Sequence, residues 1–284
     1  MEIRQVGIIG FGTMGTGIAQ LCSTSGHSTL VLVRSEERQN RGLNSIKGFL
    51  DRSVQRGDMS AEDRDAALGR ISFTSSLEDI GACDVIIESV TENVEVKREL
   101  YRTLSPLVGP NSILASNTSS VPIAEMAAVT TLPDRVCGIH FFNPAPLMKA
   151  VEVIRAITTS DETVERARAF GESLGKTVLM CKDQPGFLIN RMLWPYLLDA
   201  VRIYEAGMAT REDIDNAAKL GLNYRMGPLE LADLLGLDVL LGAAEVFYNE
   251  LRDPRFAAPT LLRRMVLAGH LGRKTGKGFY DYSK

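Results

Sequence analysis

Short apolar segments of strand length alternate with longer segments of helical period over the first two thirds of the chain. The strand candidates cover residues 6–9, 29–33, 84–88, 112–115, 136–140, 151–157 and 177–181. Helical periodicity marks residues 14–25, 36–50, 94–104 and 162–174. Because such alternation is typical of βαβ units, we predict an α/β fold with a largely parallel, doubly wound sheet and helices on both faces.

The pattern changes after the segment Gln184-Pro-Gly186, where the strand-like segments stop. The helix candidates that follow cover residues 187–206, 211–220, 229–250 and 260–268. Glycines stand where helices could end, at Gly221, Gly227, Gly236 and Gly269. We therefore predict two domains, an α/β domain over residues 1–185 and an all-α domain over residues 186–284.

Composition and charge narrow the class of protein. The chain has 284 residues, of which 45% are apolar and 24% charged, as in ordinary soluble globular proteins. A net charge of −3 provides no global field that would attract nucleic acid or an anionic membrane. The N-terminus lacks a signal-peptide pattern, and no apolar run reaches the roughly 18 residues of a membrane span. We expect a soluble, cytoplasmic protein that binds neither nucleic acid nor a membrane.

The cysteines and histidines argue against disulfides and against zinc. Cys22, Cys83, Cys137 and Cys181 are widely scattered and form no C-x-x-C pair, so we expect reduced thiols. No two Cys or His residues have the spacing of zinc ligands, so we predict no metal site. A serine hydrolase is also disfavoured, because the sequence has no G-x-S-x-G motif.

A glycine-rich loop, Gly10-Phe-Gly12-Thr13-Met14-Gly15, directly follows the first predicted strand and opens a helix. Gly10 permits a tight turn, Gly12 lets the backbone approach a pyrophosphate, and Gly15 allows close packing of helix on strand. The helix N-terminus, with Thr13 and Met14, offers free N–H groups to phosphate. In this context the motif predicts a Rossmann-type site for a dinucleotide, although a glycine turn in another α/β fold is the alternative.

The end of the second predicted strand bears on which dinucleotide binds. Many dinucleotide-binding domains have a carboxylate there that accepts hydrogen bonds from the adenosine ribose, whereas this chain has Val33. Arg34, Ser35 and Arg38 follow, and two guanidiniums with a hydroxyl suit a 2′-phosphate. We therefore favour NADP(H). NAD(H) remains possible if Arg34 is a surface residue and a glutamate of 36–37 reaches the ribose.

Polar residues gather at the ends of three further predicted strands. They lie in Ser116-Asn-Thr-Ser-Ser120, in the loop that begins at His140, and in the strand that contains Glu152. His140 ends an apolar strand, and Glu152 stands between two valines, so a buried carboxylate could pair with an imidazole. Such a pair can perform general acid–base catalysis near neutral pH. The alternative is a structural histidine and a glutamate on an edge strand.

Several long motifs resemble the short, bacterial-type 3-hydroxyacyl-CoA dehydrogenases, in particular the 3-hydroxybutyryl-CoA dehydrogenases. The motifs are GFGTMGTGIAQ, SNTSS, HFFNPAPLMKAVEVI, PGFLINR, KLGLNYRMGPLELAD and GRKTGKGFYDYSK. The resemblance runs nearly end to end. It implies a Rossmann-type first domain, a helical second domain that mediates dimerisation and therefore a homodimer, and reversible hydride transfer between NAD(P) and C3 of an acyl-CoA such as acetoacetyl-CoA or 3-hydroxybutyryl-CoA.

The resemblance also implies roles for single residues. His140 takes the place of the catalytic acid/base and Glu152 that of the residue that orients it. Ser119 and Asn190 take the places that contact the reacting oxygen. Cofactor contacts fall on Glu92, Lys97, Asn117 and Asn143, the last of these beside the nicotinamide.

The CoA moiety needs cations, and Arg52 and Arg56 fall where the family has basic CoA contacts. The two are four residues apart on a predicted helix and so share a face, although a solvated pair is the alternative. Two other functions stay open. A sugar-acid dehydrogenase would share the fold and the His–Glu pair, and a dinucleotide-binding protein without activity would share the glycine loop.

Overall fold

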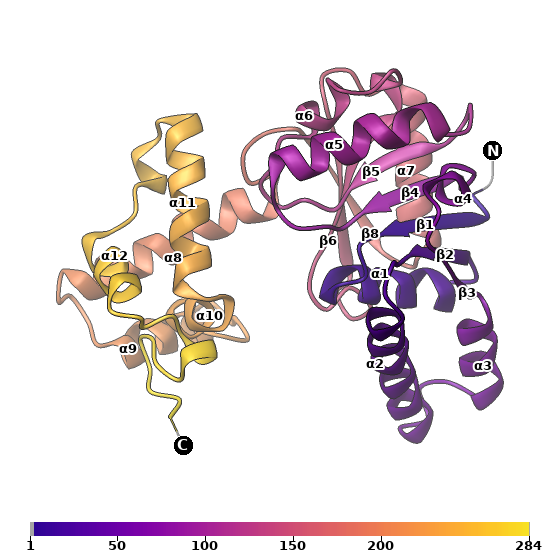
Figure 1. Cartoon of the computed structure of the whole chain (residues 1–284). Helices are drawn as coiled ribbons and strands as arrows, with labels where there is room; N and C mark the ends of the chain where they lie inside the picture. The colour runs from indigo at the N-terminus through magenta and orange to yellow at the C-terminus, as the bar shows by residue number, and fades with distance from the viewer. Residues whose placement is uncertain (1–2, 284) are drawn as a thin grey trace. The chain divides into compact units, whose positions relative to one another are not determined.

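The computed structural model describes residues 3–283, and the chain divides into two compact units between Gln184 and Pro185 (Figure 1). The first unit is built on an eight-stranded sheet with the order β3-β2-β1-β4-β5-β6-β7-β8. The strands are β1 (Gln5–Ile9), β2 (Ser28–Leu32), β3 (Ile71–Thr74), β4 (Val85–Glu88), β5 (Ile113–Ser116), β6 (Val136–Phe141), β7 (Ala150–Arg155) and β8 (Thr177–Lys182). All neighbours are parallel except β6 and β7. The predicted doubly wound α/β fold is confirmed.

Most helices of this unit begin at a residue whose side chain caps the first turn. They are α1 (Thr13–Thr24), α2 (Glu36–Gln55), α3 (Ala61–Gly69), α4 (Leu77–Gly81), α5 (Val94–Leu104), α6 (Ile123–Ala127) and α7 (Asp161–Ser173), with short 3-10 turns at Ser105–Leu107 and Pro133–Arg135. Serine or asparagine side chains cap the first-turn amides of α2, α3, α4, α5 and α7. Each such cap is worth about 1 kcal/mol, so the helix starts are encoded locally.

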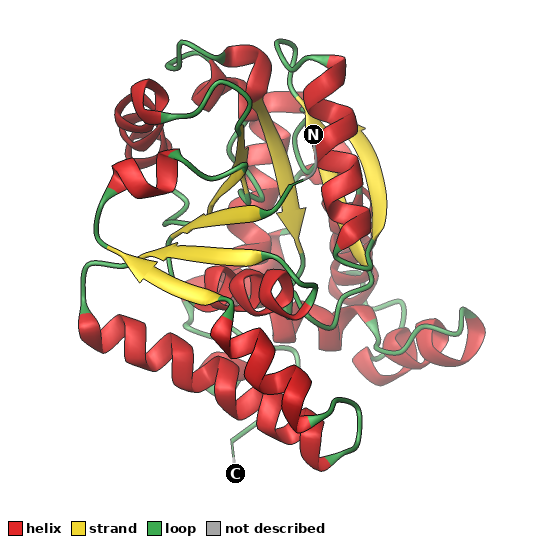
Figure 2. Ribbon diagram, turned by 90° about the vertical axis from the view of Figure 1, so that its right-hand side faces the viewer, coloured by secondary structure: helices red, strands yellow, loops and turns green. Residues whose placement is uncertain are grey.

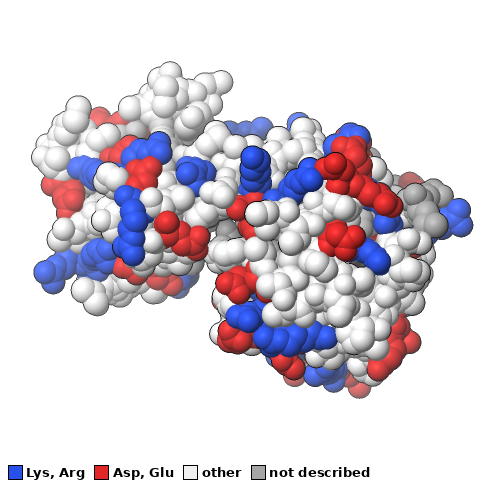
Figure 3. All heavy atoms as spheres, turned by 90° about the horizontal axis from the view of Figure 1, so that it is seen from above, with Lys and Arg blue, Asp and Glu red and all other residues white. Residues whose placement is uncertain are grey.

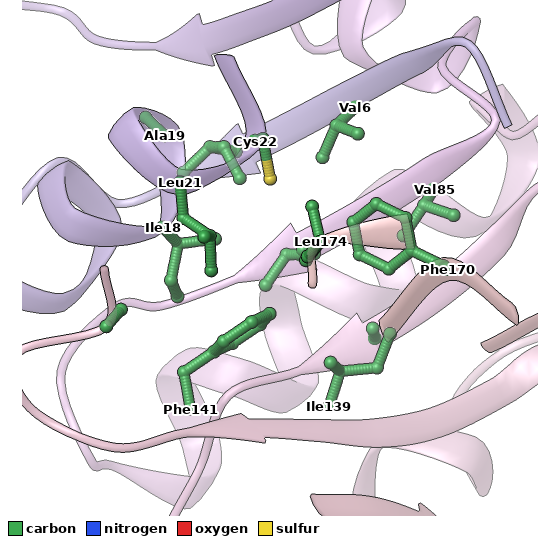
Figure 4. Close-up of a cluster of buried hydrophobic side chains, with 14 of the residues drawn as sticks. Val6, Ile18, Ala19, Leu21, Cys22, Val85, Ile139, Phe141, Phe170 and Leu174 are labelled. Carbon is green, nitrogen blue, oxygen red and sulfur yellow. The ribbon is translucent and has the colours of Figure 1, made fainter. Parts of the chain in front are cut away.

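Both faces of the sheet are buried under helices, as Figure 2 shows. Alternate residues of each strand point to opposite faces. One face packs against α1, α2, α3 and α7, and the close-up in Figure 4 labels part of this core: Val6, Ile18, Ala19, Leu21, Cys22, Val85, Ile139, Phe141, Phe170 and Leu174. Ile86, Leu114 and Ile154 lie on the other face, where α4, α5 and α6 pack. Burial of each such side chain contributes roughly 1.5–3 kcal/mol.

The second unit is helical, as predicted. It contains α8 (Ile189–Glu205), α9 (Arg211–Asn216), α10 (Pro228–Leu235), α11 (Leu237–Leu251) and α12 (Thr260–Leu267), with short helical turns at Ala217–Gly221, Pro254–Phe256 and Arg273–Thr275. The single helix predicted over residues 229–250 was wrong. Gly236, one of the glycines expected to end a helix, has a φ of +102° and separates α10 from α11. Trp194, Leu198 and Phe247 belong to the core of this unit.

Two buried aspartates fasten the C-terminal segment to this helical unit. Asp233 accepts hydrogen bonds from the backbone N–H groups of Phe279 and Tyr280 and from the Tyr282 hydroxyl. Asp215 accepts from the Tyr280 hydroxyl at 2.8 Å. Burial raises the pKa of Asp233, although these donors oppose the shift. The sequence GFYDY is therefore an anchor of the fold.

The surface has no dominant charge on the face that Figure 3 shows, where acidic and basic side chains are interspersed. This distribution agrees with the net charge of −3. Within residues 3–283, we find no helix with both the length and the apolar character that a membrane crossing requires.

Candidate active site

His140 and Glu152 face each other across the one antiparallel strand pair of the sheet. They are directly opposite in the register of β6 and β7, so their side chains emerge on the same face. His140 Nδ1 lies 2.7 Å from Glu152 Oε2, and the two residues are 3% and 0% exposed. A carboxylate at this distance orients the imidazole ring through Nδ1, so that Nε2 points toward a third group.

Ser119 is that third group. Its hydroxyl oxygen lies 2.9 Å from His140 Nε2. Ser119 belongs to the loop after β5, which is the parallel neighbour of β6, so the carboxyl ends of both strands meet at one edge of the sheet. The Phe142 ring packs edge-on against the imidazole, with ring centroids 4.7 Å apart. Glu152, His140 and the exposed Ser119 thus form a continuous hydrogen-bonded array that ends at the surface.

The glycine loop has the shape that a pyrophosphate requires. A Cβ at Gly10 would lie 2.5 Å from the Ser89 carbonyl oxygen, and one at Gly15 would lie 1.8 Å from the Gly10 carbonyl oxygen, so both must be glycine. A Cβ at Gly12 would meet nothing within 4 Å. Gly12 is also the N-cap of α1, and no side chain caps the first-turn N–H groups of this helix. These residues fit a phosphate-bearing cofactor.

The segment that follows β2 is basic. Val33 donates its backbone N–H to the Thr74 carbonyl, which continues the pairing of β2 with β3. Ser35 caps α2 by accepting the N–H of Arg38, and Arg34 and Arg38 are exposed.

The glutamates that could replace the missing carboxylate lie in the first turn of α2. Glu36 and Glu37 are both exposed, and Glu37 forms an ion pair with Arg41 at 2.8 Å. Glu37 is therefore already partnered within its own helix.

A cavity of about 570 Å³ lies between α1, α2 and the loop after β6. Arg38, Arg41 and Arg52 line it from α2, and Asn143 lines it from the loop after β6. The residues that line the rest are Phe11, Gly12, Thr13, Thr16, Gly17, Gln20, Gly42, Ser45, Phe49, Pro144, Ala145 and Pro146. Sequence reasoning missed Arg41, although its position three residues after Arg38 on one helix was a usable signal.

The two arginines predicted as CoA contacts differ in their surroundings. Arg52 lines the cavity, with its guanidinium 6.0 Å from the centroid of the Phe49 ring. Arg56 is the C-cap residue of α2 and forms an ion pair with Asp58 at 2.8 Å. The Arg56 N–H still donates to the Arg52 carbonyl at 3.1 Å, so the two residues lie one turn apart at the end of α2, and Arg52 is the one that lines the cavity.

Three residues expected to contact the cofactor have partners within the protein. The Asn117 side chain accepts the Phe141 N–H at 2.8 Å and so joins the ends of β5 and β6. Glu92 accepts hydrogen bonds from the SNTSS loop, and Lys97 is buried against Glu92. Burial works to raise the pKa of Glu92, but Lys97 and the hydrogen bonds from this loop outweigh it and lower the pKa.

The remaining predicted residue, Asn190, lies in the helical unit, in the first turn of α8. Among residues 3–283, no group of three or more His, Cys, Asp or Glu side chains is arranged to hold a metal ion.

Comparison with known proteins identifies the class to which this fold and site belong. The 3-hydroxyacyl-CoA dehydrogenase NAD binding domain matches residues 5–184, and the C-terminal domain of the same family matches residues 186–282. The chain therefore belongs to the 3-hydroxyacyl-CoA dehydrogenase family of oxidoreductases, and the resemblance found in the sequence is confirmed.

Several similar proteins are named as 3-hydroxybutyryl-CoA dehydrogenases. The chain is 44% identical to a 3-hydroxybutyryl-CoA dehydrogenase of Mycobacterium tuberculosis over 99% of both chains. It is 43% identical to a probable 3-hydroxybutyryl-CoA dehydrogenase of Bacillus subtilis, over all of this chain and 99% of the relative. The crystal structure of an (S)-3-hydroxybutyryl-CoA dehydrogenase from Ralstonia eutropha superposes with a TM-score of 0.97 at 44% identity, with full coverage of both chains.

Proposed function

We propose that this protein is an (S)-3-hydroxybutyryl-CoA dehydrogenase. It transfers a hydride reversibly between NADP(H), or NAD(H), and C3 of a short-chain 3-hydroxyacyl- or 3-ketoacyl-CoA. The observation that carries the proposal is the Ser119–His140–Glu152 array, in which successive polar atoms are 2.9 and 2.7 Å apart. The names of the relatives at 43–44% identity support this substrate class.

His140 is the general acid and base of this reaction. When acetoacetyl-CoA is reduced, protonated Nε2 donates its proton to the C3 oxygen; when 3-hydroxybutyryl-CoA is oxidised, neutral Nε2 removes the hydroxyl proton. Glu152 keeps the other ring nitrogen protonated and stabilises the imidazolium. The bound nicotinamide supplies or accepts the hydride. Ser119 and, by the family resemblance, Asn190 donate hydrogen bonds to the oxygen on which negative charge develops.

The cofactor proposed is NADP(H). Support comes from Val33 in place of a carboxylate and from the exposed Arg34 beside Ser35. A guanidinium and a hydroxyl suit a phosphate dianion, whereas an aspartate would repel it.

The cavity between α1 and α2 supports a substrate with a CoA nucleotide. Two guanidiniums, those of Arg41 and Arg52, provide the positive charge that its phosphates need in a chain of net charge −3. This cavity favours a CoA thioester over the free carboxylate of a sugar acid.

The test is the initial rate of acetoacetyl-CoA reduction by NADPH and by NADH at matched concentrations, with oxidation of free gulonate measured in parallel. We expect reduction of acetoacetyl-CoA with a preference for NADPH, and an Arg34→Ala variant that raises the KM for NADPH but leaves that for NADH unchanged. Preference for NADH would retain the enzyme and make Arg34 a bystander. Activity with gulonate alone would overturn the acyl-CoA assignment.

A further inference from the structure

A buried ion pair lies directly behind the loop that carries Ser119. Lys97, on α5, and Glu88, at the end of β4, each have side chains 1% exposed, and Lys97 Nζ lies 2.7 Å from Glu88 Oε1. Glu88 is held further by the Ser116 hydroxyl at 2.7 Å and the Val90 N–H at 2.7 Å. Burying two charges is costly unless their geometry and hydrogen bonds are good, so such a pair calls for an explanation.

Lys97 also contacts a second carboxylate that is not buried. Its Nζ lies 3.1 Å from Glu92 Oε2, and the Glu92 side chain is 38% exposed. The ammonium therefore bridges Glu88, inside the fold, and Glu92, at the edge of the site. Because Lys97 cannot move without breaking the buried pair, it fixes the orientation of the Glu92 carboxylate.

The other oxygen of Glu92 holds the SNTSS loop. Oε1 accepts hydrogen bonds from the Thr118 hydroxyl at 2.5 Å and from the backbone N–H of Ser119 at 2.7 Å. The N–H and hydroxyl of Ser120 donate to the same oxygen at 3.1 and 3.2 Å. One carboxylate oxygen thus gathers four donors from three successive residues. The hydroxyl of the middle residue, Ser119, reaches His140.

We infer that Lys97 is a positioning residue for the reaction: through Glu92 it fixes the loop that keeps the Ser119 hydroxyl on His140 Nε2. This role rests on the proposed function and differs from the direct cofactor contact that the family resemblance suggested for Lys97. Nζ is enclosed between two carboxylates, whereas Ser119 is exposed where substrate would bind. Since catalysis is sensitive to displacements of about 1 Å, a loosened Ser119 should slow turnover.

The experiment compares Lys97→Met with Lys97→Arg, and uses Lys182→Met, an exposed lysine at the end of β8, as the matched control. For acetoacetyl-CoA reduction we expect Lys97→Met to lower kcat about 10- to 100-fold. The Kd for NADPH, measured by fluorescence, should change less than twofold. Lys97→Arg should recover part of kcat, and Lys182→Met should match the wild type.

A second pair of variants separates positioning from folding. Glu88→Gln combined with Lys97→Met removes the stranded buried carboxylate, so thermal stability should recover while kcat stays low. Glu92→Gln weakens the same link at an exposed residue and should also lower kcat. A weaker Kd for NADPH at unchanged kcat would make Lys97 a cofactor contact, and unchanged kcat and Kd would leave it a purely structural residue; either result overturns the inference.

A substrate-independent measurement distinguishes failure of this inference from failure of the proposed function. The ¹⁵N chemical shift of His140 Nε2 should differ between wild type and Lys97→Met, because its Ser119 partner is displaced. If the wild type does not reduce acetoacetyl-CoA, the proposed function fails while this shift still tests the positioning role. An identical Nε2 shift in both proteins would contradict that role.

Discussion

In the proposed reaction, His140 depends on the charge that Glu152 presents to its ring. The two residues are opposite each other in the β6–β7 register, and Glu152 is fully buried. A glutamine would retain the shape but carry no charge, and its amide could donate to Nδ1 and favour the wrong tautomer. We predict that Glu152→Gln lowers kcat by about 10²- to 10⁴-fold with little change in the Kd for NADPH. Glu162→Gln, an exposed change in α7, is the control; equal kcat in both variants would contradict this role.

The lowered pKa of Glu92 implies that the free energy of unfolding depends on pH. Its folded-state pKa lies below the ordinary value of 4.5, so the ionised carboxylate stabilises the fold above the unfolded pKa. This contribution is lost as pH falls through the folded pKa. We therefore expect wild type to exceed Glu92→Gln in free energy of unfolding at pH 7, with the difference shrinking below about pH 4.5. Denaturant titrations over this range provide the measurement, and a difference that is independent of pH would refute the argument.

At the level of single residues, sequence reasoning identified groups whose chemistry is local. The placement of His140 at a strand end and of Glu152 between valines was visible in the chain, and the structure brings the two together. Sequence reasoning did not predict that Lys97 is buried, because its burial depends on how α5 packs over β4. The pairing of Arg56 with Asp58 was equally hidden, since it depends on where α2 ends.

At the scale of elements, a lysine from the turn before β8 binds the loop after β6. Lys176, in the turn between α7 and β8, donates to the carbonyl oxygens of Ala145 at 2.9 Å, Pro146 at 3.2 Å and Met148 at 2.7 Å. One ammonium thus binds three carbonyls of the loop between β6 and β7, which forms a wall of the arginine-lined cavity.

Removing this ammonium should loosen the cavity wall. We predict that Lys176→Met raises the KM for acetoacetyl-CoA about 3- to 10-fold, since hydrogen bonds to a charged donor are worth roughly 1.5–3 kcal/mol and the loop can partly reorganise. Steady-state kinetics beside Lys182→Met tests this. An unchanged KM would show that the loop keeps its conformation without Lys176.

Elements were predictable where the local pattern was strong. Seven of the eight strands were expected from their apolar runs, whereas β3 (Ile71–Thr74) was missed because it is short and only partly buried. Strand β7 ends at Arg155, so its predicted extension to residue 157 was wrong, and Ile157 is 96% exposed. The break at Gly236 depends on a positive φ that helical periodicity does not reveal.

At the scale of the whole molecule, strand order creates the site. Glu88 and Ser116 are partners across β4 and β5, and Ser116 and Gly138 are partners across β5 and β6. Segments separated by dozens of residues therefore end side by side at the carboxyl edge of the sheet, where open α/β sheets bind ligands. Local sequence does not contain this order, so the Glu92–Ser119 contact could not be predicted from sequence.

The homodimer stays a prediction at this scale. The helical unit exposes large apolar side chains, with Leu220 84%, Met208 79% and Leu267 78% exposed. The family resemblance assigns dimerisation to this part of the chain, so we expect a second copy to cover some of this surface. Sedimentation equilibrium should give twice the mass of one chain at micromolar concentration; the mass of a single chain throughout would contradict the prediction.

The most direct test of the account is the turnover of His140→Ala in acetoacetyl-CoA reduction, measured with the better of NADPH and NADH and beside the wild type. Because His140 is the proposed proton donor, we predict a kcat at least about 100-fold below that of the wild type. Cofactor binding, followed by fluorescence, should be retained. Turnover close to that of the wild type would remove His140 from the mechanism and, with it, the proposed reaction at this site.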